Sequence, residues 1–435
     1  MSSASPTSGA AEAGQGTRRS NLPSLTGLRF FAALLVFFFH TSLSNSPIPP
    51  NDPINPFADE DIATTYEKLL LNTGYIGVSF FFVLSGFVLA WSSRPGQRMT
   101  AFWRRRVTKL FPNHLVVFAA SLVLFAGSAI ASVGHWLPNL FMVHSFFPQP
   151  DVNLSMNPPS WSLSSELLFY LLFPLLIVPI RRIREGALWA WAAAMVAGTV
   201  LVQLVSMHLV PATPKSAITP ISDMQFWFGY LFPPGRLFEF VLGVLLARIV
   251  LAGRWPGWAT TPFALLLTAL GYGAGFMVPF EYTFVVATIV PIGALIGAVA
   301  VSDSRGDRSW LSSRTMVWLG EVSFGFYLVQ GVTIFYLRSL MDGATYGVPG
   351  SLLVIAGFFA VSLAGGALLH HYVEMPAMRR FGRSRKEMRE PADAGRPSVT
   401  RTATGTIGEP AVPAQGVRSP EPGAGKPGNP TAPVP

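Results

Sequence analysis

The chain has 435 residues, of which half are apolar and only 12% are charged, and its mean hydropathy is +0.43. A soluble protein of this size does not need so much apolar surface, so the composition indicates a polytopic membrane protein and excludes an ordinary soluble enzyme. The absence of cysteine from the sequence excludes disulfides, thiolate metal sites and cysteine nucleophiles.

Stretches of about twenty apolar residues predict an all-α bundle of ten membrane-spanning helices. The expected spans are residues 25–44, 72–91, 112–131, 162–180, 187–207, 232–252, 261–279, 283–301, 316–338 and 350–371. The first hydrophobic run is long and has no small-residue cleavage site, which indicates a retained span rather than a signal peptide.

The composition divides the chain into three parts. Residues 21–378 form the predicted transmembrane domain, and residues 1–20, rich in Ser, Ala and Gly, are expected to be a disordered cytoplasmic N-terminus. Residues 379–435 are rich in Pro, Gly, Ala, Ser and Arg and show no hydrophobic periodicity. They cannot bury enough apolar surface to fold, so we predict a disordered cytoplasmic tail.

The positive charge, formally +9 in total, is concentrated in every second connection between the predicted spans. These basic connections contain Arg94, Arg98, Arg104, Arg105, Arg106, Lys109, Arg181, Arg182, Arg184, Arg248, Arg254, Arg305, Arg308 and Arg314. By the positive-inside rule, the basic connections and both termini are cytoplasmic in a multi-pass protein of the cell membrane. Membrane topology therefore explains much of the charge, and we expect no nucleic-acid partner.

The first span contains an ionisable side chain at depth. Arg29 and His40 are eleven residues apart, and at about 100° and about 1.5 Å per residue they share one helix face, about 16 Å apart in depth. Arg29 can then lie at the cytoplasmic surface while His40 lies inside the membrane. A charge-capable group at that depth is costly unless it lines a cavity or has a partner, so His40 is a candidate functional residue. The alternative is a histidine packed against another helix with its hydrogen bonds satisfied.

A basic run with aromatic neighbours follows the second span. Its four cations are Arg104, Arg105, Arg106 and Lys109. Arginine presents a fork of donors to phosphate oxygens, and aromatic rings offer stacking surfaces for a purine, so the run is a candidate phosphate-binding patch. The alternative is an ordinary set of topology determinants.

A carboxylate follows a cluster of serines at the outer end of the fourth span. This residue, Glu166, is a candidate partner that orients His40 or stabilises its charged form, as carboxylates do in base catalysis. The alternative is a carboxylate at a helix N-terminus that satisfies amide donors and the helix dipole.

Other polar groups have simpler explanations. Arg236 and Glu239, spaced i,i+3, are expected to neutralise each other at a helix end. His370, His371 and Glu374 close the last span, where imidazoles favour the helix dipole, and we predict no metal site. The sequence contains no glycine-rich phosphate loop, HExxH or GxSxG motif, which excludes nucleotide-driven transport and the usual serine hydrolase elbow.

Taken in order, the motifs resemble the membrane-bound acyltransferase 3 family. The resemblance covers about residues 21–378 and is closest to the actinobacterial branch that includes macrolide acyltransferases. It rests on the segments LPSLTGLRFFA at 22–32 with His40, GVSFFFVLSGF at 77–87, the arginine run ending at Pro112, WSLSSELLFY at 161–170, GRLFEF at 235–240, LGEVSFGFYL at 319–328, and Glu374 with Pro376.

The resemblance implies an enzyme that transfers an acyl group, often acetyl, from cytoplasmic acyl-CoA to a hydroxyl of a sugar, glycan or secondary metabolite such as a macrolide. It implies that Arg29 and His40 form the functional signature. It also associates the basic motif, through Arg106 and Lys109, with the acyl-CoA donor.

Three positions depart from the family pattern. Lys109 stands where arginine is usual, Ser79 where an aspartate is common, and Gln330 where a histidine is frequent. Lysine is a point charge, so bidentate phosphate contact is lost at position 109. The Ser79 form of its motif is the one that most resembles the actinobacterial branch.

These residues together predict a membrane O-acyltransferase in which His40 is the general base, Glu166 orients it and Arg29 helps to hold acyl-CoA at the entrance. A two-step route through an acyl-histidine is the alternative mechanism. The rival function is a proton-coupled secondary transporter or flippase in which His40, Glu166 and Glu239 relay protons. A receptor or scaffold without chemistry would leave the buried histidine and the basic run unexplained.

Overall fold

A computed structural model describes residues 21–48, 51–127 and 132–382 of the chain. Over these residues the regular elements are all helices, and β pairing is limited to three isolated bridges. The predicted all-α class is therefore confirmed. Ten longer helices follow the predicted spans in order: α1 (Pro23–Ser42), α2 (Glu60–Ser92), α3 (Met99–Leu124), α6 (Trp161–Arg182), α7 (Leu188–Leu209), α9 (Leu237–Leu251), α10 (Thr261–Ala274), α12 (Ile289–Arg305), α13 (Arg314–Ser339) and α14 (Val348–Leu369).

Seven helical segments within the described ranges are long and apolar enough to cross a membrane. They are Pro23–Ser42, Glu60–Ser92, Met99–Leu124, Pro158–Arg182, Glu185–Leu209, Arg314–Ser339 and Val348–Phe381. The other three predicted spans correspond to the shorter helices α9, α10 and α12, of 15, 14 and 17 residues. The structure thus supports a multi-pass membrane protein, whereas the count of ten spans and the cytoplasmic termini stay predictions.

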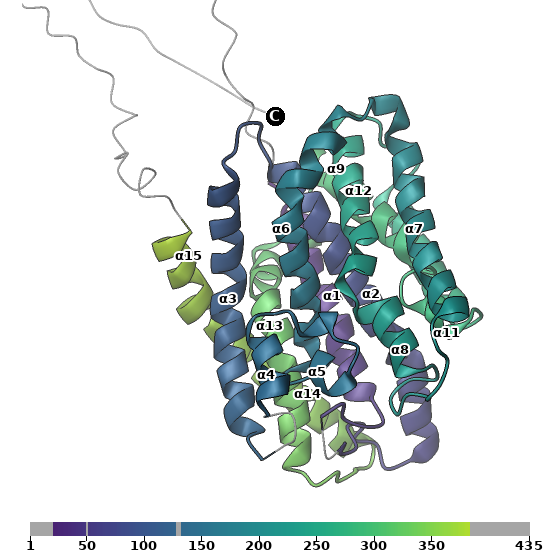
Figure 1. Cartoon of the computed structure of the whole chain (residues 1–435), viewed down its shortest axis with the longest axis vertical. Helices are drawn as coiled ribbons and strands as arrows, with labels where there is room; N and C mark the ends of the chain where they lie inside the picture. Colours follow the sequence, from purple (N-terminus) through teal and green to yellow (C-terminus); the bar gives the residue numbers. More distant parts are fainter. Residues whose placement is uncertain (1–20, 49–50, 128–131, 383–435) are drawn as a thin grey trace, which may run out of the picture. The chain divides into compact units, whose positions relative to one another are not determined.

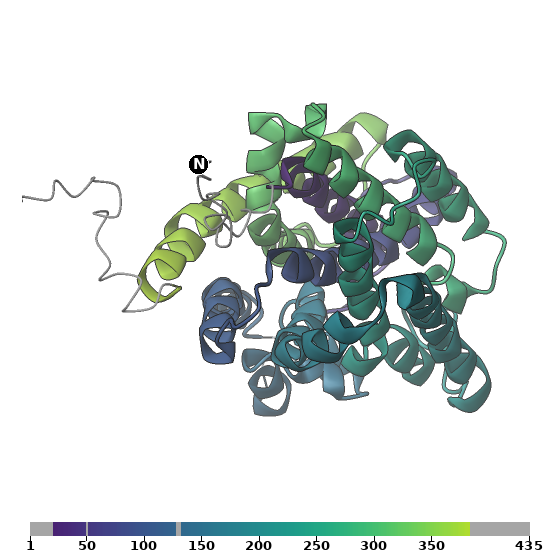
Figure 2. The same ribbon diagram turned by 90° about the horizontal axis from the view of Figure 1, so that it is seen from above.

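The two segments predicted to be disordered, 1–20 and 379–435, lie outside the described residues apart from 379–382. There the last helix, α15 (Met375–Phe381), extends beyond the predicted boundary at residue 378. The two views of the bundle place α15, the most yellow segment, at its edge (Figures 1 and 2).

Short helices and basic turns lie toward opposite ends of the bundle (Figure 1). The short helices α4 (Val133–Leu140), α5 (Pro150–Asn153) and α8 (Asp223–Phe226) lie in the lower half of the view, and α11 (Phe280–Thr283) connects α10 to α12. The arginine-bearing turns from α2 to α3 and from α6 to α7 lie at the upper end. This is the segregation of charge on which the topology prediction depends.

Close approach of two backbones holds α9 against the last third of α2. Where these helices cross, a Cβ atom added at Gly86 would lie 1.9 Å from the carbonyl oxygen of Phe240. A Cβ added at Gly243 would lie 1.9 Å from the carbonyl oxygen of Val83. Small residues permit this spacing between helices in membranes, where van der Waals packing is a main source of association.

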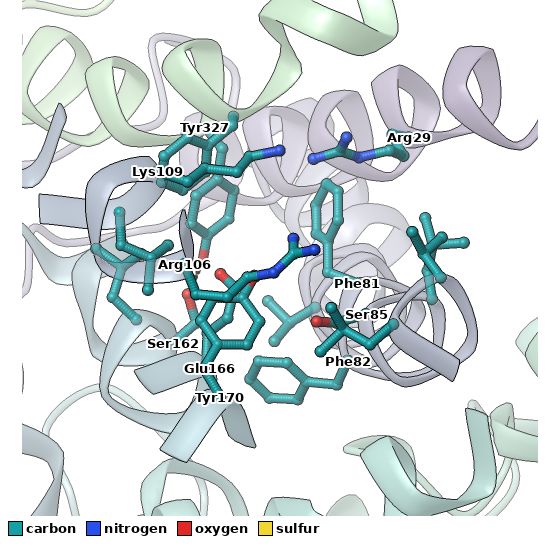
Figure 3. Close-up of a pocket in the computed structure, with 17 residues that line it drawn as sticks. Arg29, Phe81, Phe82, Ser85, Arg106, Lys109, Ser162, Glu166, Tyr170 and Tyr327 are labelled. Atoms are coloured by element: carbon teal, nitrogen blue, oxygen red, sulfur yellow. Dashed lines mark hydrogen bonds between the residues drawn. The ribbon is translucent and has the colours of Figure 1, made fainter. Parts of the chain in front are cut away.

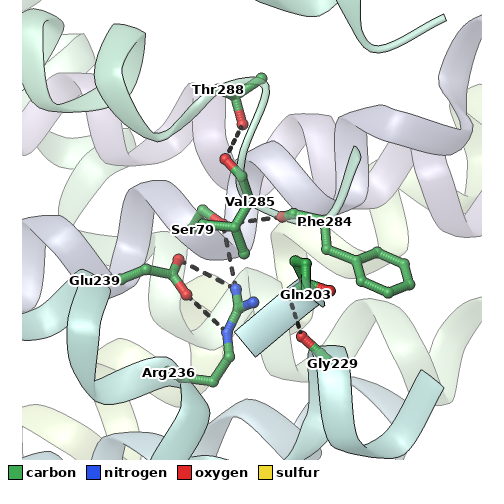
Figure 4. A network of polar contacts seen from close by, with 8 residues as sticks. All are labelled: Ser79, Gln203, Gly229, Arg236, Glu239, Phe284, Val285 and Thr288. Atoms are coloured by element: carbon green, nitrogen blue, oxygen red, sulfur yellow. Dashed lines mark hydrogen bonds and ion pairs between the residues drawn. The ribbon is translucent and has the colours of Figure 1, made fainter. Parts of the chain in front are cut away.

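A buried ion pair lies at the same contact between α2 and α9 (Figure 4). The Arg236 Nε atom lies 2.9 Å from Glu239 Oε1, and the two side chains are only 2% and 1% exposed. Arg236 also donates a hydrogen bond of 3.2 Å to Ser79 Oγ on α2, and its guanidinium lies over the rings of Phe82 and Tyr230. The predicted mutual neutralisation of Arg236 and Glu239 is confirmed, and the pair joins the start of α9 to α2.

We expect removal of one member of this pair to cost more stability than removal of both. Arg236→Met should lower the free energy of unfolding by about 3–5 kcal/mol, because Glu239 would stay buried without its partner. The double variant Arg236→Met, Glu239→Leu removes both charges and should recover part of that loss. Thermal unfolding of the detergent-purified variants measures the difference, and a double variant as unstable as the single one would contradict this role.

Candidate active site

Side chains from α1, α2, α3, α6 and α13 surround a cavity of about 110 Å³, which we call the basic cavity (Figure 3). Arg29 and Lys109 lie in the halves of α1 and α3 nearer to the arginine-bearing turns. The polar side chains that line it are Arg29, Ser85, Arg106, Lys109, Ser162, Glu166, Tyr170 and Tyr327.

One face of α6 supplies a carboxylate and two hydroxyls to the basic cavity. Ser162, Glu166 and Tyr170 follow one another at intervals of four residues, so they project from the same side of the helix. The Tyr170 hydroxyl donates a hydrogen bond to Glu166 Oε1. Because α6 begins at Trp161, Glu166 lies beyond its first turn. Glu166 therefore lines the cavity and does not cap the helix.

Three cations converge on this cavity. In Figure 3 the side chains of Arg29 and Lys109 extend toward each other, with Arg106 below them. Among the described residues, none of the three has a carboxylate oxygen within 4.0 Å. The Arg106 guanidinium lies over the rings of Phe102 and Tyr170, 5.5 and 5.6 Å from their centroids. Arginine and lysine side chains can donate charge-assisted hydrogen bonds to anionic oxygens, so the three cations are candidates for contact with an anion.

The structure divides the predicted basic run between two environments. Arg106 and Lys109, spaced i,i+3 on α3, line the basic cavity, whereas Arg104 and Arg105 are not among the residues that line it. Arg104 is exposed and Arg105 is half-buried. The phosphate-binding patch stays a prediction for all four cations, and only Arg106 and Lys109 of the run line this cavity.

A second cavity, of about 70 Å³, has His40 in its lining, and we call it the histidine cavity. His40 is 6% exposed, and its ring centroid lies 5.1 Å from that of Phe39 and 5.6 Å from that of Phe335. Its Nδ1 atom has no hydrogen-bond partner within the described structure. Buried polar atoms are normally satisfied, so the alternative of a fully bonded packing histidine is not supported.

The two cavities share two lining residues, Val78 of α2 and Tyr327 of α13. Arg29 lines one cavity and His40 the other, in keeping with their predicted separation in depth. Glu166, in contrast, lines the basic cavity, and the described residues include no hydrogen bond between it and His40. The structure therefore does not bring the predicted orienting carboxylate to the histidine, because Glu166 is already bonded to a tyrosine in the other cavity.

Tyr170 and Tyr327 also line the basic cavity, and neither was a candidate from the sequence. Both belong to segments that carry the family resemblance, but a tyrosine within an apolar span is also an ordinary packing residue. The available signal was the four-residue spacing from Glu166 to Tyr170, which places the two on one helix face.

The histidine of the loop before α6 is structural. His144 is fully buried, and its ring nitrogens lie 3.3 Å from Ser160 Oγ and 3.4 Å from Ser164 Oγ. Burial lowers the pKa of His144 to about 3, so the ring is neutral. These contacts fix the start of α6, the helix that carries Glu166.

The cluster at the end of α14 also contains an acid and an imidazole. His370 Nδ1 lies 3.5 Å from Glu374 Oε2, and Asn113 of α3 donates a hydrogen bond to the same oxygen. Within the described ranges, no group of three or more His, Cys, Asp or Glu side chains is placed to hold a metal ion.

A multi-pass helical bundle with an ionisable side chain in an internal cavity is the architecture of a membrane-embedded enzyme or transporter. The sequence distinguishes between these classes, because the model of the acyltransferase 3 family, described as an acyltransferase domain, matches residues 22–371. The chain belongs to this acyltransferase family, so the protein is an acyltransferase enzyme and the predicted resemblance is confirmed.

Three relatives extend the comparison. "Acyltransferase MdmB" of Streptomyces mycarofaciens is 39% identical over 393 residues, which cover 87% of this chain and 98% of the relative. "Putative peptidoglycan O-acetyltransferase YrhL" of Bacillus subtilis is 27% identical over 71% of this chain and 48% of the relative. "Peptidoglycan O-acetyltransferase OatA" of Listeria monocytogenes is 23% identical over 82% of this chain and 56% of the relative. No solved structure matches the chain.

The neutral, buried His144 predicts a pH dependence of stability. Its pKa in the fold lies below the ordinary value of 6.5, so the unfolded chain binds more protons once the pH falls below that value. Stability is therefore lost progressively as the pH falls from 6.5 toward 3. We expect His144→Gln to flatten the decrease of Tm between pH 7 and pH 5.

Thermal unfolding of the purified protein across this pH range measures the effect. His208→Gln changes an exposed histidine at the end of α7, for which no carboxylate lies within 4.0 Å among the described residues, and serves as the control, with the wild-type profile expected. Identical profiles for wild type and His144→Gln would show that His144 does not titrate on unfolding.

Proposed function

We propose that the protein is a cell-membrane O-acyltransferase that moves an acyl group, expected to be acetyl, from cytoplasmic acyl-CoA to a hydroxyl of a sugar, glycan or macrolide-like acceptor. The observation that carries the proposal is the adjacency of the two cavities: a cavity with three cations shares Val78 and Tyr327 with a cavity that contains His40. This adjacency supports a mechanism in which a polyanionic donor binds on one side of a shared wall and a general base acts on the other.

Acyl-CoA is the donor that the basic cavity would hold. Coenzyme A carries several phosphate oxygens, and Arg29, Arg106 and Lys109 line one cavity without a carboxylate oxygen within 4.0 Å among the described residues. The negative phosphates would therefore neutralise these three cations. If the termini are cytoplasmic as predicted, these cations lie toward the cytoplasm, where acyl-CoA is found. Glu166 and Tyr170 then form part of the donor cavity, and Glu166 does not orient His40 in this proposal.

His40 supplies the proton transfer. Its neutral ring takes the proton of the acceptor hydroxyl as that oxygen attacks the thioester carbonyl carbon. The new C–O bond forms, the C–S bond breaks, and the proton passes to the leaving thiolate, so the products are an ester and coenzyme A. The rings of Phe39 and Phe335 pack around His40, and its Nδ1 atom has no hydrogen-bond partner among the described residues, so this nitrogen is available to take that proton.

The acceptor is expected to carry a hydroxyl on a sugar-like or macrolide-like scaffold. The names of two relatives describe O-acetylation of peptidoglycan, a glycan, and this supports a hydroxyl acceptor for the present chain. The histidine cavity is lined in part by the loops before α6 and before α8, through Pro159 and Ile218. Such loops are suited to acceptor recognition because they differ readily between related enzymes.

We expect His40→Ala to lower acceptor-dependent thiol release from acetyl-CoA by about 100-fold to 10,000-fold, the usual contribution of a general base. The assay uses detergent-purified full-length protein with a panel of sugars and macrolides. His135→Ala, outside both cavities, should keep wild-type activity. Full activity of a folded His40→Ala variant would remove His40 from the mechanism. Proton-dependent substrate flux without acyl-CoA consumption would instead support the transporter.

We expect Arg106→Ala to weaken the binding of coenzyme A by at least about tenfold, because it removes a charge-assisted contact to phosphate. Arg104→Ala, an exposed arginine on the same helix, is the matched control and should leave the affinity within about twofold. Titration calorimetry at low salt measures both affinities. Equal weakening by the two substitutions would indicate a diffuse surface charge effect rather than a site in the basic cavity.

A further inference from the structure

The wall between the two cavities includes two side chains that line both of them. Val78 and Tyr327 line both cavities, and each is buried, with 3% and 6% of its surface exposed. Val78 belongs to α2 and Tyr327 to α13, so the wall joins two helices that are distant in the sequence. A group that moves from the cations to His40 has to pass these two side chains.

Hydrogen bonds at its hydroxyl hold the Tyr327 side chain in place. Its hydroxyl donates to the carbonyl oxygen of Pro159 at 3.0 Å and lies 2.9 Å from Ser162 Oγ. Pro159 lines the histidine cavity and Ser162 lines the basic cavity, so the hydroxyl is anchored at the boundary between them. Figure 3 shows Tyr327 beside Ser162, and the ring packs edge-on against Phe81 with centroids 5.8 Å apart.

The backbone next to Tyr327 is equally restricted. Asn157 donates a hydrogen bond of 3.0 Å to the carbonyl oxygen of Leu328. A Cβ atom added at Gly331 would lie 2.2 Å from Asn157 Oδ1 and 2.6 Å from Pro159. The turn before α6 therefore packs directly on α13, and Tyr327 has little freedom to move aside. The passage is set by the sizes of fixed side chains.

We propose that Tyr327 and Val78 form a size filter for the acyl group, and that the Tyr327 ring, packed beside the acyl group, also keeps bulk water that enters the basic cavity away from the donor thioester. This inference rests on the proposed transfer from acyl-CoA to an acceptor at His40. A short acyl group such as acetyl extends between the two side chains and reaches His40. A longer or branched chain is excluded because the valine methyl groups and the fixed ring fill the passage.

The barrier to water follows from the same geometry. If the ring is removed, water that enters through the basic cavity can attack the thioester carbonyl carbon in place of the acceptor hydroxyl. The C–S bond then breaks, a C–O bond to the water oxygen forms, and the proton reaches the thiolate, which yields a free carboxylic acid and coenzyme A. Loss of the filter should therefore appear as altered chain-length selectivity and as hydrolysis without acceptor.

The decisive variant is Val78→Ala, a small change in the wall. We measure kcat/KM for acetyl-CoA and butyryl-CoA with the same acceptor, using detergent-purified full-length protein and mass detection of the ester. The ratio of butyryl to acetyl transfer should rise by about tenfold, the discrimination typical of one or two methylene-sized spaces. Val83→Ala, a fully buried valine on the same helix that lines neither cavity, should keep the wild-type ratio.

Tyr327→Leu tests the water barrier. Its acceptor-independent thiol release should rise severalfold relative to transfer, whereas Tyr336→Leu, on the same helix but outside the lining of both cavities, should not raise it. If Tyr327→Leu does not fold, Val78→Ala decides the proposal alone.

The outcomes separate this inference from the proposed function. If wild type transfers acetyl but Val78→Ala and Val83→Ala give the same ratio, the filter is overturned and the transferase stands. If folded wild type transfers no acyl group from any acyl-CoA, the proposed function fails and the filter fails with it.

Discussion

The free energy needed to place an ion in hydrocarbon limits where this bundle can hold its charged side chains. Arg236 and Glu239 meet that constraint by neutralising each other, with Ser79 and two aromatic rings around the guanidinium. Arg29 and Lys109 meet it differently, because they line a cavity and have no carboxylate within 4.0 Å among the described residues. One set of charges is satisfied within the protein, and in the proposed function the phosphates of the donor neutralise the other.

This division explains why the candidate site consists of two cavities rather than one. An anionic donor requires cations and solvent access. A histidine that acts as a base must be unprotonated, and apolar surroundings favour that form. Along α1 the two requirements are met at different depths, by Arg29 and by His40. Val78 and Tyr327 line both cavities, so in the proposed mechanism the thioester passes them to reach His40 while the phosphates stay with the cations.

The order of the helices could be predicted from the sequence because the hydropathy of a segment depends only on its own residues and not on how the helices pack. The depth of His40 followed in the same way from its spacing to Arg29, and the Arg236–Glu239 pair from a spacing of three residues. The predicted contact between Glu166 and His40 had no such local basis. It required knowledge of which way α6 is rotated, and α6 turns Glu166 toward Tyr170 and the basic cavity.

The sequence by itself determined the all-helical membrane class, the acyltransferase family and the candidate residues His40, Arg29, Arg106 and Lys109. Only the tertiary structure decided that Arg104 and Arg105 do not line the basic cavity, that Glu166 belongs with the cations, and that Tyr327 stands between the cavities. The physical reason is that composition and spacing fix what each helix carries and at what depth. Which side chains meet across helices depends on helix rotation and close packing, as at Gly86 and Gly243, and these arise only when the helices assemble.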